Sequence, residues 1–151
     1  MKKDVKLYNV LFPVWMLMTI PQTWVVVIPG NFLMDSLVLI FAMMMLKMEN
    51  RKEFYKKHIL KVFALGFLAD ILAAIPMGIG AWGFEFGGPY GDSLLLTLPG
   101  VLLAAVLIFV FDYFVSFREC EKGLRLRLAL TFAIVTAPYT YMIPSGWIYG
   151  F

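Results

Sequence analysis

The chain has 151 residues, of which 62% are hydrophobic and 15% charged, and its mean hydropathy is +0.83. A soluble domain has about 45–50% apolar and about 25% charged residues, so this composition argues against a water-soluble fold and predicts a single domain embedded in a lipid bilayer. The formal net charge of +3 is not gathered into a basic patch among aromatic residues, so we expect no nucleic-acid partner.

Five apolar segments follow one another along the chain, and we predict that each forms a transmembrane helix. About 20 residues, rising 1.5 Å each, are needed to cross a hydrocarbon core of about 30 Å. The second and fifth segments reach this length only with residues from their flanks. The expected fold is therefore an all-α polytopic bundle, with helices at residues 7–28, 32–46, 62–82, 93–117 and 128–144.

Pro29, Gly30 and Asn31 separate the first two segments and predict a break in the helix. Two arrangements remain open at this point. The two segments form either two full spans or one re-entrant hairpin that returns to the side from which it came. Unpaired backbone groups are costly in lipid, which favours two full spans.

The basic residues predict the orientation of the chain. All 13 Lys and Arg residues fall within 2–6, 47–61 and 118–127, whereas 29–31, 83–92 and the C-terminus contain none. With five crossings and a cytoplasmic N-terminus, every basic residue lies inside, as the positive-inside rule expects. The compact loops suit a bacterial cytoplasmic membrane. We also expect residues 47–57 to be helical, since Glu53 and Lys57 have the spacing of a helical ion pair.

The chain has one cysteine, Cys120, and one histidine, His58, and both belong to the basic stretches. A single cysteine cannot form an internal disulfide, and no cluster of metal ligands is evident. We interpret these residues as a reduced thiol and a solvated imidazole. No metal and no cofactor is expected, and no catalytic set is recognisable, so we do not expect an enzyme.

Three carboxylates lie inside the apolar segments, which contain no Lys, Arg or His residue: Asp35, Asp70 and Asp112. An ionised carboxylate in the bilayer costs several kcal/mol unless it is paired or hydrated. Asp70 lies about 13 Å beyond Lys61 along a helix, near the midplane. Asp35 is the easiest of the three to explain structurally, because the second segment begins only a few residues earlier and a helix N-terminus tolerates negative charge.

Small residues at four-residue spacing surround two of these carboxylates, and such stripes mark helix–helix contact faces in membranes. Asp70 and Asp112 are therefore expected to face protein and not lipid. On the fifth predicted helix, Thr136 and Tyr139 are candidate hydrogen-bond partners for them. The three stripes are Gly66, Asp70, Ala74 and Gly78; Gly100, Ala104, Ile108, Asp112 and Ser116; and Ala129, Ala133, Ala137 and Thr140.

These features support two hypotheses. In the first, the chain transports protons, cations or cationic solutes through a site at Asp70, Asp112 and Asp35, and Glu85 and Asp92 form an acidic outer mouth. In the second, it is a non-transporting accessory, regulatory or immunity-type subunit, in which the aspartates join helices. The expected partners are the lipid bilayer and either further copies of the chain or a larger membrane protein.

Overall fold

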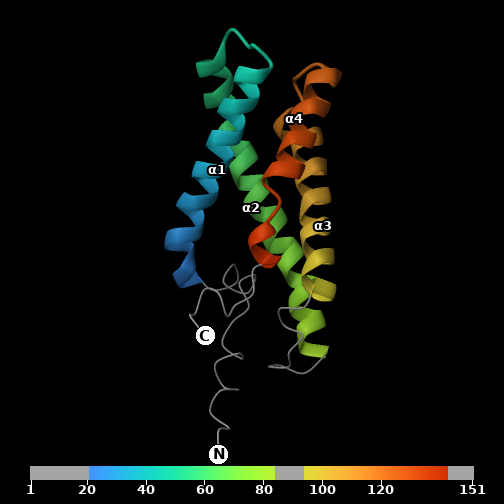
Figure 1. Cartoon of the computed structure of the whole chain (residues 1–151). Helices are drawn as coiled ribbons and strands as arrows, with labels where there is room; N and C mark the ends of the chain where they lie inside the picture. Colours follow the sequence, from blue (N-terminus) through green and yellow to red (C-terminus); the bar gives the residue numbers. More distant parts are fainter. Residues whose placement is uncertain (1–20, 84–93, 143–151) are drawn as a thin grey trace, which may run out of the picture.

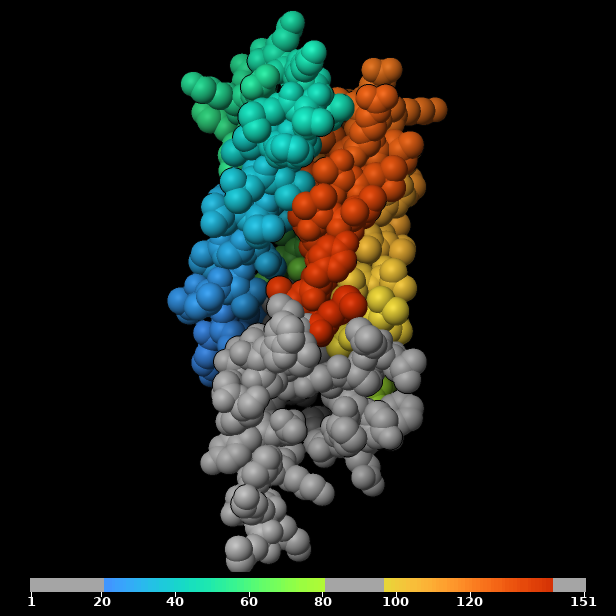
Figure 2. Space-filling view, viewed as in Figure 1, coloured from blue at the N-terminus to red at the C-terminus, as the bar shows by residue number. Residues whose placement is uncertain are grey.

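The computed structural model describes residues 21–83 and 94–142, and every element in these two ranges is a helix. Neighbouring helices run antiparallel, and the first helix packs against the fourth as well as the second, which closes the bundle (Figure 1). On the face seen in Figure 2, the fourth helix lies between the first and the third. The α-helices are α1 (Trp24–Met45), α2 (Arg51–Gly83), α3 (Leu94–Phe111) and α4 (Lys122–Val135).

Three stretches are long and apolar enough to cross a membrane: Pro21–Met45, Arg51–Gly80 and Thr97–Ser116. Only 28–33% of the most apolar window in each is buried within the protein, and the exposed surface carries large apolar side chains such as Leu37 and Leu102. The interior, in contrast, holds seven polar or charged residues within the described ranges. Besides an apolar core, the bundle therefore has buried aspartates and a broad exposed apolar surface, and both are unusual for a water-soluble bundle. The predicted class, an all-helical protein embedded in a membrane, is therefore supported.

The predicted break at residues 29–31 is wrong, because α1 runs through it without interruption. Pro29 removes one backbone hydrogen bond from the helix, whereas a loop inside lipid would leave several groups unpaired. The segment predicted as a second helix, 32–46, is instead the C-terminal part of α1. Most of the first predicted helix, 7–28, lies outside the described residues.

α1 ends in a Schellman cap, which reverses the chain toward α2. The N–H groups of Lys47 and Met48 donate to the carbonyls of Met44 and Met43, each at 3.1 Å. Lys47 adopts the left-handed conformation that this cap requires, with φ of 51°. The helix predicted over residues 47–57 therefore begins only at Arg51, and Lys57 forms its ion pair with Glu119 in place of Glu53.

The fourth predicted helix, 93–117, corresponds to α3 and a π-helical turn, η5 (Asp112–Ser116). The fifth, 128–144, is displaced, because α4 begins at Lys122 and ends at Val135. Pro138 lies just beyond this end and cannot continue the helix, and a 3-10 helix, η6 (Tyr139–Met142), follows. With 14 residues, α4 is about 21 Å long, which is shorter than the hydrocarbon core.

The α1–α2 and α3–α4 connections lie at the same end of the bundle (Figure 1). Three of the 13 basic residues precede residue 21, and the other ten all lie at or near these two connections. An ion pair between Lys57 and Glu119 joins the two connections, and this hydrogen-bonded pair lowers the pKa of Glu119. Two of the three predicted basic stretches therefore share one end, which we call the basic end.

Candidate functional site

The three carboxylates singled out in the sequence are all buried in the bundle. The exposed fractions are 6% for Asp35, 6% for Asp70 and 1% for Asp112. They come from α1, α2 and the turn after α3, respectively. Their burial confirms the prediction that Asp70 and Asp112 face protein.

Asp35 does not lie at a helix N-terminus, so the structural explanation expected for it is wrong. Because α1 begins at Trp24 and ends at Met45, Asp35 lies near the middle of the helix, about 15 Å along the axis from Met45. Its side chain points toward α2, since a Cβ atom placed on Gly66 would lie 3.7 Å from Asp35 Oδ2. The partial positive charge of a helix terminus is too far away to stabilise this carboxylate.

Asp70 lies on α2 one helical turn beyond Gly66, the residue that Asp35 Oδ2 faces. The Tyr141 hydroxyl donates to the backbone carbonyl of Asp70 at 3.1 Å, which leaves the carboxyl group untouched. Asp70 Oδ1 is buried and has no hydrogen-bond partner among the described residues. A buried polar atom of this kind costs about 1–3 kcal/mol or more and calls for an explanation.

Asp112 begins the π-helical turn and is held by the last residue of that turn. The Ser116 hydroxyl donates to Asp112 Oδ1 at 2.7 Å, whereas Asp112 Oδ2 is buried and has no partner within the described residues. π-Helical turns are rare and often occur at functional sites.

No basic side chain forms an ion pair with these carboxylates in the described part of the chain. The ion pair in these ranges joins Lys57 to Glu119, and both side chains are more than half exposed. The residues described also contain no group of three or more His, Cys, Asp or Glu side chains placed to hold a metal ion. The carboxylates must therefore be neutral, hydrated or served by a ligand, because isolated charges are costly at this depth.

The predicted small-residue stripes lie largely at helix contacts. The whole α3 stripe is buried, as are Asp70 and Ala74 of the α2 stripe. The contact between α2 and α3 is close, since a Cβ atom on Gly100 would lie only 2.0 Å from Met77 Sδ. On α4 and beyond it, Ala129, Ala133 and Ala137 are buried, whereas Thr140 is exposed.

The hydrogen-bond partners predicted for the carboxylates are wrong. The Thr136 hydroxyl donates to the carbonyl of Phe132 at 2.8 Å, and the Tyr139 hydroxyl donates to the carbonyl of Ile134. Both bonds satisfy carbonyls at the end of α4, where Pro138 prevents the helix from continuing. The tyrosine that reaches a carboxylate-bearing residue is Tyr141, and it contacts the backbone of Asp70.

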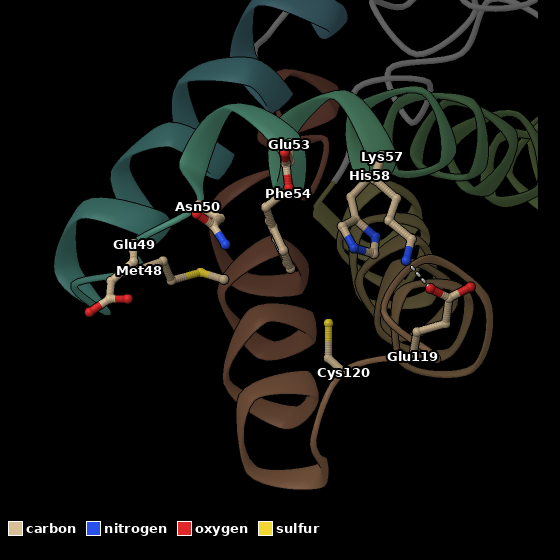
Figure 3. A pocket seen from close by; sticks show the side chains of 9 residues that line it. All are labelled: Met48, Glu49, Asn50, Glu53, Phe54, Lys57, His58, Glu119 and Cys120. Carbon is tan, nitrogen blue, oxygen red and sulfur yellow. Dashed lines mark ion pairs between the residues drawn. The ribbon is translucent and has the colours of Figure 1, made fainter.

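His58 is not solvated, contrary to the sequence interpretation. It is 2% exposed, and its Nδ1 lies 2.7 Å from the carbonyl oxygen of Ser116, to which it donates. It also lines a pocket of about 520 Å³ at the basic end, where the thiol of Cys120 faces the same space (Figure 3). The pocket is lined by Met48, Glu49, Asn50, Glu53, Phe54, Lys57, His58, Glu119 and Cys120.

The sequence did contain a signal for the burial of His58. Four-residue steps back from Gly66 reach Val62 and then His58, so both residues continue the stripe that includes Asp70. Val62 is also buried. The stripe was cut short because α2 was expected to begin at residue 62, whereas it begins at Arg51.

The two residues of the expected outer mouth, Glu85 and Asp92, lie outside the described residues. The chain matches no protein-family model, and comparisons with curated proteins and with solved structures found no match.

Proposed function

We propose that this chain is a small membrane transporter or channel for protons, cations or cationic solutes, and that Asp70, Asp112 and Asp35 handle the transported charge. One observation carries the proposal. Asp70 and Asp112 each bury a carboxylate oxygen that has no hydrogen-bond partner among the described residues. An ionisable group inside a membrane is a functional candidate by default, because its burial is costly and it brings no stability in return.

The alternative role, in which the aspartates only join helices, predicts a different geometry. A carboxyl group that joins helices is stabilising when its oxygens are bonded across the contact. Asp112 has one such bond, but Ser116 lies on the same turn and not on a neighbouring helix. Asp70 joins helices through its backbone carbonyl, which any residue would supply equally well.

We propose further that the basic end faces the cytoplasm, as the positive-inside rule expects. The N-terminus of α1 is then at the outer face. A cytoplasmic N-terminus and a total of five crossings require one more crossing before residue 21, which would bring the remaining basic residues to the same side. In this orientation Glu85 and Asp92, between α2 and α3, form the outer acidic mouth. A bacterial cytoplasmic membrane and assembly of several copies suit the small bundle.

The proposal is tested by ion flux in proteoliposomes that contain the purified chain. Protons, sodium, potassium and an organic cation are offered in turn, and the variant Asp70→Asn is compared with the wild type. We expect the variant to lower the flux of the transported species by about tenfold or more, because it removes a group that binds or transfers charge.

The matched control is Glu121→Gln, which removes an acidic charge from an exposed position at the basic end. It should leave the flux unchanged. Wild-type vesicles that move none of the four cations would contradict the proposal. If such a chain also co-purified with a stoichiometric membrane partner, the accessory role would be favoured instead.

A further inference from the structure

The positions of the three carboxylates relative to one another indicate both the transported species and the order in which the carboxylates act. We infer that the transported species is the proton and that Asp35 is the central residue of a relay from Asp70 through Asp35 to Asp112. This inference rests on the proposed function. From the sequence alone, Asp35 is the easiest of the three to explain structurally.

The central place of Asp35 follows from its neighbours. His58, two helical turns before Gly66 on α2, lies 2.7 Å from the carbonyl oxygen of Ser116, and Asp112 lies one turn from Ser116 toward the middle of the bundle. Asp35 Oδ2 faces the α2 backbone at Gly66, one helical turn before Asp70. α1, which carries Asp35, packs against both α2 and α4, and α2 contacts the turn that carries Asp112. Asp35 therefore lies between the other two carboxylates along the axis of the bundle, which is the place of the middle residue in a relay.

The unpartnered oxygens occur at the two outer members of this series. Asp70 is 6% exposed and Asp112 is 1% exposed, and each keeps one buried oxygen without a partner among the described residues. An oxygen in this state can accept a hydrogen bond, or can carry a proton that it donates to a neighbouring carboxylate. Both ends of the series thus have an unused site at which a proton can arrive or leave.

The same geometry disfavours a bound metal ion. Metal cations that prefer oxygen ligands, such as Mg²⁺ and Ca²⁺, take about six or more of them. In the described ranges the carboxylates are not gathered into a group that could hold a metal ion. They are spread along the bundle, which suits transfer from group to group better than binding at one point.

The packing around the carboxylates also disfavours a bulky organic cation. The neighbours of Asp70 on the inner face of α2, Ala69 and Ala73, are fully buried. A drug-sized ligand needs a cavity of about 300 Å³ or more. The pocket at the basic end exceeds this volume, but none of the three aspartates lines it. A proton requires no such space.

Each transfer in the relay conserves charge and atoms. When protonated Asp70 gives its proton to ionised Asp35, the O–H bond of Asp70 breaks, an O–H bond forms on Asp35, and the negative charge moves from Asp35 to Asp70. The same exchange between Asp35 and Asp112 brings the proton toward the basic end. There the Ser116 hydroxyl donates to Asp112. His58 is bonded to the backbone carbonyl of Ser116, which carries no proton, so the relay ends at Asp112.

The experiment compares Asp35→Asn with Ser36→Ala in proteoliposomes, using an internal pH-sensitive dye for protons and indicator dyes for sodium and potassium. Ser36 is buried beside Asp35, and its hydroxyl is hydrogen-bonded to Tyr55 at 2.8 Å, so its loss perturbs the same region without removing a proton carrier. We expect Asp35→Asn to lower proton flux by about a hundredfold, as the loss of a proton-transfer group does. Ser36→Ala should leave the flux unchanged.

A second measurement does not depend on flux. Dicyclohexylcarbodiimide enters membranes and reacts with protonated carboxyl groups, so mass spectrometry of the wild type near neutral pH should find the adduct on one or more of the three aspartates. Sodium should not protect them, because sodium is not the ligand. Three results would each overturn the relay while leaving the proposed transport intact. They are protection of the aspartates by sodium, a flux of sodium or potassium that does not depend on protons, and an unchanged proton flux in Asp35→Asn. Wild-type vesicles that move no ion would overturn both.

Discussion

His58 provides a hydrogen-bond donor for a backbone carbonyl at the end of η5, the turn that follows α3. The carbonyl of Ser116 lies at the end of the π-helical turn, beyond which the chain leaves the helix, so it lacks a partner within its own helix. Because a carbonyl oxygen only accepts, the bond at 2.7 Å places a hydrogen on His58 Nδ1. The imidazole packs against both Phe54 and Phe117, whose ring centroids lie 4.2 and 5.5 Å away and whose rings stack on each other.

We predict that His58→Phe destabilises the protein through this one hydrogen bond. Phenylalanine is close in shape to histidine and keeps the aromatic contacts, but it leaves the carbonyl of Ser116 buried without a donor. An unsatisfied buried group costs about 1–3 kcal/mol, so the midpoint of thermal unfolding in detergent should fall. Intrinsic tryptophan fluorescence would measure this unfolding midpoint.

Tyr55→Phe is the matched control for this prediction. It removes a hydroxyl from the same region of α2, where Tyr55 bonds to Ser36 in a part-buried position. Tyr55 is only partly buried, so the midpoint should fall by less than in His58→Phe. An unfolding midpoint for His58→Phe equal to that of the wild type would show that the Ser116 carbonyl does not depend on the imidazole.

The contact between α2 and α3 shows how closely two elements of this bundle approach. Gly100 has no side chain, and the space is filled by Met77, which is 2% exposed. Without a hydrophobic driving force between helices in lipid, close packing over small residues provides much of the association energy. The α3 stripe, which includes Gly100, therefore determines how closely α3 lies against α2.

We predict that Gly100→Ala destabilises the bundle. The added Cβ would lie 2.0 Å from Met77 Sδ and 2.7 Å from Met77 Cγ, and the methionine is too buried to move aside freely. Overpacking of this kind costs about 1–3 kcal/mol, which thermal unfolding in detergent would detect. Adding Met77→Ala should recover part of the loss, so the two substitutions should not be additive.

Gly30→Ala is the matched control, because nothing lies within 4 Å of the Cβ that it would add in the middle of α1. Alanine is the better helix former by about 0.5–1 kcal/mol, so this variant should be as stable as the wild type or more stable. If both glycine variants behaved alike, close packing at Gly100 would not explain the effect.

The elements could be predicted from the sequence where hydropathy alone decides them. The long apolar run of α3 was located to within a few residues, and its buried stripe, including Asp112 and Ser116, was identified from spacing. The helix boundaries at Pro29 and Arg51 were not predicted correctly. Pro29 resembles a turn signal in water, but in lipid the helix continues through it. The amphipathic start of α2 contains Lys and Arg residues that pattern reading assigns to a loop.

The candidate site was predicted as a set of residues but not as an arrangement. The three aspartates could be recognised because no basic residue shares their apolar segments. Their relative positions depend on which helices are neighbours, and sequence periodicity carries no information on that point. The position of Asp35 in particular depends on where α1 begins, so one wrong boundary placed it near a helix N-terminus and not in the middle of α1.

At the scale of the whole molecule, the separation of charge gives the bundle its direction. The described basic residues lie at one end, and the exposed sides of the three long helices are apolar. Cys120, the single cysteine of the chain, lies in the α3–α4 connection at the basic end and is half-buried. It is therefore a native reporter of the side on which this end lies.

We predict that a membrane-impermeant maleimide labels Cys120 in inside-out vesicles and not in intact cells. Burial raises the pKa of the Cys120 thiol. The reactive thiolate is therefore scarce at neutral pH, and the labelling rate should rise about tenfold for each pH unit until that pKa is reached. Labelling is best followed at mildly alkaline pH, with denatured protein as the measure of complete reaction.

A cysteine introduced at the opposite end of the bundle provides the matching labelling experiment. Gln22 is exposed in η4 (Pro21–Thr23), before the start of α1, and Gln22→Cys in a Cys120→Ser background moves the thiol to the other end of the bundle. This thiol should react in intact cells and be protected in inside-out vesicles. The reverse pattern would place the basic end outside and remove the proposed direction of proton transfer. Reaction of both thiols from the same side would mean that α1 does not cross the membrane, and Asp35 would then have no place in a transmembrane path.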